Sequence, residues 1–236
     1  MIAAVGRFEM RPLVDALRAM AANANPDYDH ELRSEGSELT HDCGWGVVFR
    51  EGDRLVRRRS AASCLSDPGF DELSGIRTDL AILDVRRTPD RSTIDVLNSH
   101  PFLQKWRGEE WAFCHNGAVA DLTQFTSDST LTLTGSVDSE VMFHHVLTLL
   151  DTGSPAQSLA EILGRVTGFT CLNSFLATSG RIVAHARMSP DTPRPRYYTM
   201  WHGRGDGFSL VSSETFGSAV DRWSAVPGGT SLVLTP

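Results

Sequence analysis

Lysine is almost absent from this 236-residue sequence, because Lys105 is the only one among 22 lysine and arginine residues. The basic residues are also outnumbered by 29 aspartates and glutamates, which gives a formal net charge of −7 at pH 7. Proteins that bind nucleic acids in general present an excess of basic residues to the phosphates. The excess of acidic residues therefore argues against a nucleic-acid partner. The small magnitude of the net charge argues against a chain that is disordered throughout.

Long apolar segments are missing too. The longest apolar runs, at residues 80–83 and 146–150, are far shorter than the roughly 20 residues that a membrane-spanning helix needs. The first residues contain no basic stretch followed by an apolar core, so we expect no secretion signal. These features predict a cytoplasmic protein with no membrane partner.

Cysteine is scarce, and its spacing argues against the usual cysteine-based sites. The four cysteines are far apart in the sequence and include no Cys-x-x-Cys pair: Cys43, Cys64, Cys114 and Cys171. We therefore expect neither a disulfide framework nor a zinc ribbon. The adjacent histidines 144 and 145 would point to different sides of a helix, so neither a metal nor a cofactor is expected.

Apolar residues make up 41% of the sequence, enough for the core of a single domain over residues 1–236. Helical spacing predicts helices beginning at Pro12 and covering about residues 156–166. Candidate strands are more numerous and lie at residues 2–8, 44–49, 54–58, 80–85, 111–115, 172–178, 181–187, 197–202, 208–213 and 232–234. Strands joined by short turns, with a few amphipathic helices, predict an α+β fold of antiparallel sheets covered by helices.

A third helix is expected to begin near Ser136, which can serve as its cap. The acidic Asp138 in its first turn suits the positive end of the helix dipole. In this helix Val141, His145 and Leu149 would share one face. Residues 190–196 contain three prolines and predict a surface loop.

Three short segments occur in an order that points to chemistry. They are Asn98-Ser99-His100-Pro101-Phe102, His115-Asn116-Gly117 and Val137-Asp138-Ser139-Glu140. The series resembles the motifs of the class II glutamine amidotransferases, in the N-terminal nucleophile hydrolase superfamily. Further similar segments extend the resemblance over essentially the whole chain: residues 42–46, 85–88, 172–176 and 212–214.

The resemblance implies a four-layer α/β/β/α sandwich with a cleft for glutamine or a γ-glutamyl compound. It assigns substrate binding to Arg86, His115 and Asp138. The planar guanidinium of Arg86 suits an α-carboxylate, and the carboxylate of Asp138 suits an α-ammonium group. Taken alone, Arg86 could instead form a surface ion pair, and Asp138 could be a helix N-terminal acid bonded to backbone amides.

The resemblance also assigns an oxyanion hole to the side chain of Asn116 and the backbone N–H of Gly117. Two amide donors fixed before the reaction would stabilise the developing oxyanion, although an Asn-Gly pair is also common in turns. His100, which precedes Pro101, is interpreted as a residue that shapes its loop. Cys43 is interpreted as a small buried hydrophobe.

The start of the sequence departs from the family pattern. Family members begin Met-Cys, and after removal of the methionine the N-terminal thiol attacks the substrate amide with its own α-amino group as the base. With Gly6 as the anchor, Ile2 stands at the position of that cysteine. The bulk of Ile2 also predicts that Met1 is retained, so we expect the cleft without the nucleophile.

Three hypotheses remain open from the sequence. The first is an amidotransferase-like protein that binds without hydrolysing and serves as a partner subunit, for example beside a synthetase, or in a repurposed reaction. The second is an active glutamine amidotransferase or γ-glutamyl amidohydrolase whose N-terminus is misassigned or altered. The third is a purely structural use of the sandwich, because a fold does not fix a function.

Overall fold

The computed structural model describes residues 1–36, 39–217 and 220–236. In this part of the chain the strands form two antiparallel sheets. The seven-stranded sheet consists, in spatial order, of β11 (Arg222–Ala225), β9 (Trp201–Gly205), β10 (Phe208–Ser212), β1 (Ile2–Glu9), β4 (Arg77–Val85), β2 (Trp45–Glu51) and β3 (Arg54–Ser60). The five-stranded sheet consists of β12 (Thr230–Leu234), β8 (Arg181–Ala186), β7 (Asn173–Thr178), β6 (Glu109–Asn116) and β5 (Phe102–Trp106).

Helices connect and cover the sheets. The α-helices are α1 (Arg11–Ala21), α2 (Glu31–Ser34), α3 (Pro68–Asp71), α4 (Asp138–Leu149), α5 (Pro155–Gly164) and α6 (Pro195–Tyr198). Four short 3-10 helices are η1 (Glu72–Gly75), η2 (Arg91–Thr93), η3 (Val96–Asn98) and η4 (Leu122–Gln124). Among the described residues, no helix has both the length and the apolar character needed to cross a membrane.

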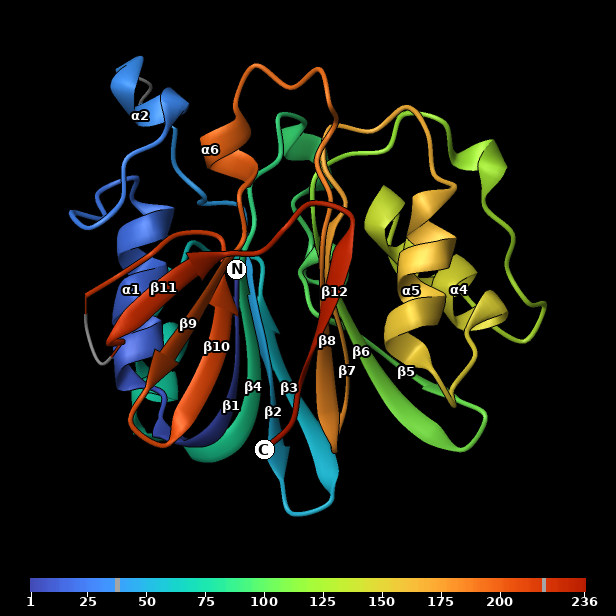
Figure 1. The fold of residues 1–236 in the computed structure, drawn as a ribbon, viewed down its shortest axis with the longest axis horizontal. Helices are drawn as coiled ribbons and strands as arrows, with labels where there is room; N and C mark the ends of the chain where they lie inside the picture. Colours follow the sequence, from blue (N-terminus) through green and yellow to red (C-terminus); the bar gives the residue numbers. More distant parts are fainter. Residues whose placement is uncertain (37–38, 218–219) are drawn as a thin grey trace.

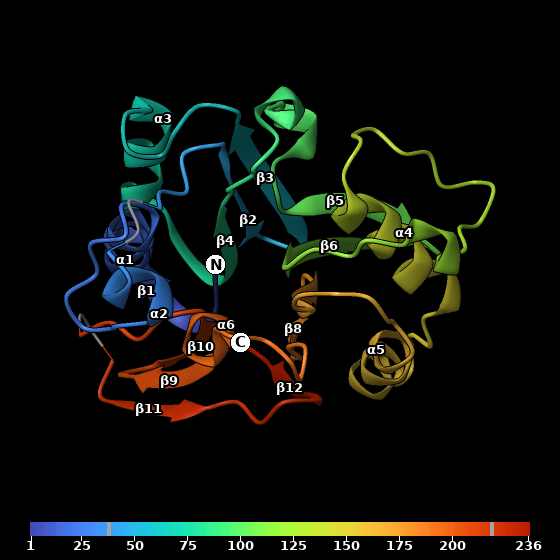
Figure 2. The same cartoon turned by 90° about the horizontal axis from the view of Figure 1, so that it is seen from above.

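The layers follow from which faces are apolar. Helix α1 lies on the outer side of the seven-stranded sheet, and α4 and α5 lie on the outer side of the five-stranded sheet (Figures 1 and 2). Three apolar clusters fill the spaces between successive layers: one includes Leu17, one includes Phe175, and one includes Phe113 stacked on Phe143. The expected α+β sandwich of four layers is confirmed.

Strand β1 lies inside the seven-stranded sheet, between β10 and β4, and both of its faces are buried over its first four residues. Its side chains alternate between the two sides of the sheet, as in any strand. Ala3 and Val5 belong to the cluster between the sheets, together with Met1 just before the strand. Ile2 and Ala4 belong instead to the cluster beneath α1. The direction of each side chain at the chain start is therefore fixed by this alternation.

The start of α4 differs from the expectation. Val137 occupies the N-cap position, and no side chain caps the helix there. Ser136 is turned away, because its hydroxyl accepts a hydrogen bond of 3.3 Å from the Asn98 side chain. The expected Ser136 cap is therefore wrong, since this serine joins the end of η3 to the segment before α4.

The face of α4 that contains Val141, His145 and Leu149 is the outer one, and Leu149 is 47% exposed. The buried side of the helix carries Phe143 and Leu147 among others. Apolar and polar side chains are mixed on both faces of the helix, so the spacing of Val141, His145 and Leu149 did not decide which face is covered.

Two strands, β5 and β11, and three short α-helices, α2, α3 and α6, were missed in the sequence. Residues 197–202 were expected to form a strand, but Pro195 begins the single turn of α6, where its fixed φ suits a helix start. Strands β5 and β11 gave no clear signal, because each is short and lies at or near a sheet edge with polar residues among its few members.

The packing between the sheets can be tested at Phe175, which is fully buried there. We expect Phe175→Ala to lower the free energy of unfolding by about 3–5 kcal/mol, because the cavity left behind collapses only in part. The control Val233→Ala changes a side chain that is 52% exposed and should stay within about 0.5 kcal/mol. Urea denaturation measures both, and equal effects would contradict the assignment of the core.

Candidate functional site

A cavity of about 670 Å³ lies at the end of the sandwich where β1 begins. The end of β4, the end of β6, the start of α4 and the segment after β10 all reach it. The five residues to which the resemblance assigns a role all line this cavity: Arg86, His115, Asn116, Gly117 and Asp138. Residues far apart in the sequence are thus brought to one place by the ends of the strands.

Arg86 is placed by backbone pairing directly after β4. Its N–H donates to the carbonyl of Gly44 at 2.8 Å, and its own carbonyl accepts from the N–H of Cys43 at 3.0 Å. Gly44 has φ +120° and could not carry a side chain, because a Cβ there would lie 2.5 Å from the Ser99 hydroxyl. The motif at residues 42–46 therefore serves to bring the chain close to the arginine.

The guanidinium of Arg86 makes hydrogen bonds to one residue, Thr93. It donates to the carbonyl and hydroxyl of Thr93 at 3.0 and 2.9 Å, while a guanidinium has five N–H donors. The residue is buried, and its side chain makes no ion pair with any described residue. The alternative of a surface ion pair is wrong for Arg86, and donors remain for an anion.

Asp138 is half-buried as the first residue of α4. One carboxylate oxygen accepts from the N–H of Val119 at 2.8 Å, and the other accepts from the N–H of Ser139 at 2.8 Å. The alternative of a helix N-terminal acid bonded to amides is therefore correct. It leaves capacity for a ligand, since an ionised carboxylate has about four acceptor positions.

Asn116 and Gly117 end strand β6 at the cavity. The side-chain amide of Asn116 and the backbone N–H of Gly117 are free, since neither makes a hydrogen bond within the described residues. Gly117 has φ +141°, and a Cβ at this position would lie 1.9 Å from the carbonyl oxygen of Cys171. Only glycine fits here, and two unused amide donors lie side by side in sequence at the cavity.

His115 has a structural task at the same turn. Its Nε2 lies 3.0 Å from the carbonyl of Cys171, and its Nδ1 lies 3.0 Å from the hydroxyl of Ser139. A carbonyl only accepts, so Nε2 carries the proton and Nδ1 accepts from the serine. Burial lowers the pKa of His115, which keeps the ring neutral. The residue ties the end of β6 to the start of α4.

The chain start also reaches the cavity. The ammonium group of Met1 donates to the hydroxyl of Ser213 at 3.0 Å, and the Met1 carbonyl accepts from the N–H of Ser213 at 3.1 Å. Met1 lines the cavity, whereas Ile2 is fully buried beneath α1 and does not. The side chain that faces the motif residues is therefore that of Met1, because β1 alternates.

Sequence reasoning missed a buried polar cluster on the floor of the cavity. Asp84 lies 3.5 Å from Nδ1 of His100 and accepts a hydrogen bond of 3.3 Å from the thiol of Cys114. Burial is the largest single influence and would raise the pKa of Asp84, but His100, the N-terminal ammonium group and the Cys114 thiol together hold that pKa below its usual value. His100 thus contacts a buried carboxylate beside the cavity, besides shaping its loop.

An outer wall closes the cavity on the side of α2 and α6. We define it by its lining residues Leu32, Leu39, His41, Arg194, Tyr197 and Tyr198. Its polar centre is the contact of 3.2 Å between Nε2 of His41 and the hydroxyl of Tyr197. Burial lowers the pKa of His41 to about 4 and raises that of Tyr197. Both rings are therefore neutral at pH 7.

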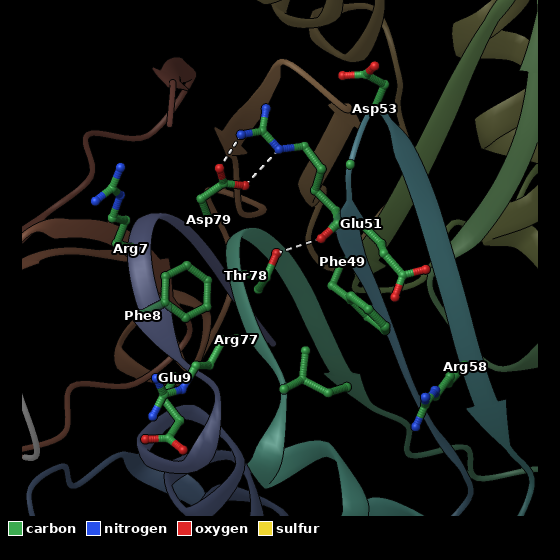
Figure 3. Close-up of a pocket in the computed structure, with 13 residues that line it drawn as sticks. Arg7, Phe8, Glu9, Phe49, Glu51, Asp53, Arg58, Arg77, Thr78 and Asp79 are labelled. Atoms are coloured by element: carbon green, nitrogen blue, oxygen red, sulfur yellow. Dashed lines mark hydrogen bonds and ion pairs between the residues drawn. The ribbon is translucent and has the colours of Figure 1, made fainter.

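A second hollow, of about 1020 Å³, lies at the opposite end of the seven-stranded sheet (Figure 3). Arg50 and Asp79 form an ion pair across it, and Arg50 also donates to the carbonyl of Ser179 at 3.0 Å. None of the motif residues lines this hollow. Although it is the larger space, the motif residues converge on the smaller cavity, which is therefore the candidate site.

Comparison with known proteins supports the family that the motifs resemble. The chain matches the family model of class II glutamine amidotransferases over residues 16–187. It is 32% identical over 113 residues to a Haemophilus influenzae protein named as a glutamine amidotransferase, and 27% identical over 114 residues to an uncharacterized protein of Methanocaldococcus jannaschii. Each match covers 47% of this chain but 38% and 31% of those relatives, about a third of their length.

Solved structures share the fold. A glutamine aminotransferase class-II domain protein from Silicibacter pomeroyi has a TM-score of 0.66 at 17% identity, covering 100% of this chain and 94% of its own. The glutamine phosphoribosylpyrophosphate amidotransferase of Bacillus subtilis has a TM-score of 0.69 at 17% identity, covering 99% of this chain and 47% of its own. Identities this low support the fold alone.

The turn at Gly117 can be tested directly. We expect Gly117→Ala to lower the free energy of unfolding by about 1–3 kcal/mol or more, because the backbone conformation is strained for a side chain and the Cβ meets a carbonyl. Gly164→Ala is the matched control, since open space surrounds that position at the end of α5. Urea denaturation of both variants decides, and an unaltered Gly117→Ala would show that the turn adapts.

Proposed function

The chain belongs to the class II glutamine amidotransferases, and from that premise we propose that its cavity binds glutamine or a γ-glutamyl compound. The observation that carries the proposal is the convergence of a cation, an anion and free amide donors on one cavity: Arg86, Asp138, and Asn116 with Gly117. A ligand with a carboxylate, an ammonium group and an amide carbonyl matches these three features.

In this proposal the amino-acid end of the ligand lies between Arg86 and Asp138. Arg86 would hold the α-carboxylate through the donors that Thr93 leaves unused. Asp138 would accept from the α-ammonium group beside its two backbone donors. Charge-assisted hydrogen bonds contribute roughly 1.5–3 kcal/mol each, which supports affinities in the range of about 1 μM to 1 mM.

The amide carbonyl of the ligand would lie at Asn116 and Gly117. Two amide donors, fixed by strand β6 and by the close packing of Gly117 on Cys171, suit an oxygen that gains negative charge. His115 is a positioning residue in this proposal, since its two ring nitrogens are bonded within the protein.

We infer further that the chain as printed binds without hydrolysing. None of its four cysteines lines the cavity, and each is at most 1% exposed. Burial raises the pKa of Cys171 to about 12 and holds that of Cys114 well above its usual value, so neither supplies a thiolate. Loss of a catalytic nucleophile typically lowers kcat by about a million-fold. A binding or partner subunit in a biosynthetic reaction fits these properties.

Hydrolysis is the second candidate, and the direction of the β1 side chains favours a specific form of it. Met1 faces the cavity and Ile2 faces α1. A cysteine would therefore act from the position of Met1, or from another position on the same side of the strand, rather than from that of Ile2. The site would then need only the thiol, because the amide donors are already present.

The carboxylate contact can be tested with two variants of Arg86. Arg86→Ala should weaken glutamine and glutamate binding by about 10- to 150-fold, the equivalent of one charge-assisted contact. Arg86→Lys should also weaken it, because an ammonium group cannot reproduce the planar fork. Arg204→Ala, at an exposed position on β9 away from the cavity, is the control. Calorimetry measures all three, and wild-type affinity in both Arg86 variants would rule the contact out.

The chain start can be tested by activity and by intact mass. The chain as printed should keep Met1 and release no ammonia from glutamine. A Met1→Cys chain, expressed behind a removable methionine, should gain slow hydrolysis, whereas Ile2→Cys should gain none because its side chain points beneath α1. Ammonia release by the printed chain would overturn the non-hydrolytic proposal. Activity in Ile2→Cys alone would overturn the assignment of the facing side chain.

A further inference from the structure

The cavity is larger than the amino-acid end of a ligand requires. Its volume of about 670 Å³ falls within the roughly 300–1,000 Å³ typical of pockets that enclose drug-sized ligands. Free glutamine is much smaller than such a ligand. The residues assigned to glutamine lie at the ends of β4 and β6 and at the start of α4, whereas the outer wall belongs to different segments. Space therefore remains between the proposed glutamine site and the outer wall.

This outer part of the cavity is aromatic. Tyr197 and Tyr198 both line it, with their ring centroids 5.0 Å apart at an interplanar angle of 73°. The imidazole of His41, bonded to the Tyr197 hydroxyl, adds a third flat, neutral ring. Aromatic side chains in such edge-to-face arrangements present surfaces that suit another aromatic ring.

The tyrosines are held in place by polar contacts on both sides of α6. The Glu31 carboxylate accepts from the N–H groups of Arg196 and Tyr197 at 2.9 and 3.0 Å. The Tyr28 hydroxyl donates to the carbonyl of Arg196 at 2.6 Å. On the other side, the Asn173 side chain donates to the carbonyl of Tyr198 at 2.7 Å. Tyr197 and Tyr198 are thus positioned before any ligand arrives.

Two arginines give this part of the cavity a positive charge. Arg87 is exposed, and its side chain makes no hydrogen bond or ion pair in the described part of the chain, although its charge acts on His41 and Tyr197. Arg194 has one loose contact of 3.6 Å with the exposed Glu35, and its buried Nε has no partner. Both guanidinium groups are therefore available to an anion.

The nearby carboxylate of Glu214 does not cancel this charge. It accepts from the Asn25 side chain at 2.8 Å. It also lies 3.6 Å from His30 and 3.8 Å from Arg33. Its partners lie in the protein, so the free charges that remain in the outer part of the cavity are positive.

We propose that the outer part of the cavity binds the amine half of a γ-glutamyl conjugate of an aromatic α-amino acid. The aromatic ring packs against Tyr197 and Tyr198, and the second carboxylate lies between Arg87 and Arg194. The inference rests on the proposed function, because the γ-glutamyl half takes the place assigned to glutamine. A free carboxylate and a ring on one ligand match the free cations and the rings of the cavity.

The test is calorimetry with four ligands on the full chain. They are glutamine, γ-glutamylphenylalanine, γ-glutamylphenethylamide, which lacks the second carboxylate, and γ-glutamylglycine, which lacks the ring. We expect γ-glutamylphenylalanine to bind at least about tenfold more tightly than glutamine, a difference of about 1.4 kcal/mol, with the other two conjugates in between. Ligands that lack one group each separate the contribution of the ring from that of the charge.

Variants then assign the charge. Arg87→Ala and Arg194→Ala should each lower the affinity for γ-glutamylphenylalanine by about tenfold and lower that for γ-glutamylphenethylamide far less. Arg204→Ala replaces another exposed arginine outside the cavity and serves as the control. Because Arg87 is exposed, its variant should fold as the wild-type chain does, and thermal denaturation checks this.

The outcomes separate this inference from the proposed function. If glutamine binds and γ-glutamylphenylalanine binds no more tightly, the inference is overturned and the proposed function stands. The same holds if the arginine variants weaken all four ligands alike. If none of the ligands binds, both are overturned. Tighter binding of the aromatic conjugate that is lost selectively in the arginine variants supports the inference.

Discussion

The carbonyl oxygen of Cys171 sets the geometry of the site. It accepts a hydrogen bond from the Nε2–H group of His115, and it lies where any side chain at Gly117 would have to be. These two contacts together determine where the end of β6 lies relative to Cys171 and in which direction the backbone N–H of Gly117 points. The other nitrogen of His115 then connects this turn to Ser139 in the first turn of α4. Moving any one of these groups would displace the others.

Neutral and charged groups are kept apart within this arrangement. The histidines at the turn and in the outer wall are neutral because burial lowers the pKa of each. In the inner part of the cavity, charge is carried by Arg86, by Asp138, by the ammonium group of Met1 and by Asp84, which contacts His100. A buried ion needs partners to remain stable, and each of these groups has protein partners that leave part of its capacity free. The inner part of the cavity therefore offers a ligand a few fixed charges.

The sequence predicted the architecture and the inner site more accurately than the details around them. Motif residues such as Arg86 and Asp138 were recognised because their type and order are distinctive, and they do meet in one cavity. The covered face of α4 was not predictable, because apolar and polar side chains are mixed on both faces and only packing selects one face. The direction of the Ile2 side chain was not predictable either. The distance of Ile2 from Gly6 in the sequence does not give the side of the sheet to which that side chain points, because this depends on strand register.

The inner and outer parts of the cavity are built from different kinds of structure. The inner part is formed by the ends of central strands whose other residues make up the apolar core. The outer wall is carried by short segments, including α2 and α6, that lie outside the two sheets (Figure 1) and meet through a few polar contacts such as that of Glu31 with Tyr197. Substitutions in the wall leave the core packing untouched, whereas substitutions in the inner part do not. Over evolution, or in the laboratory, ligand preference can therefore change here at little cost to folding.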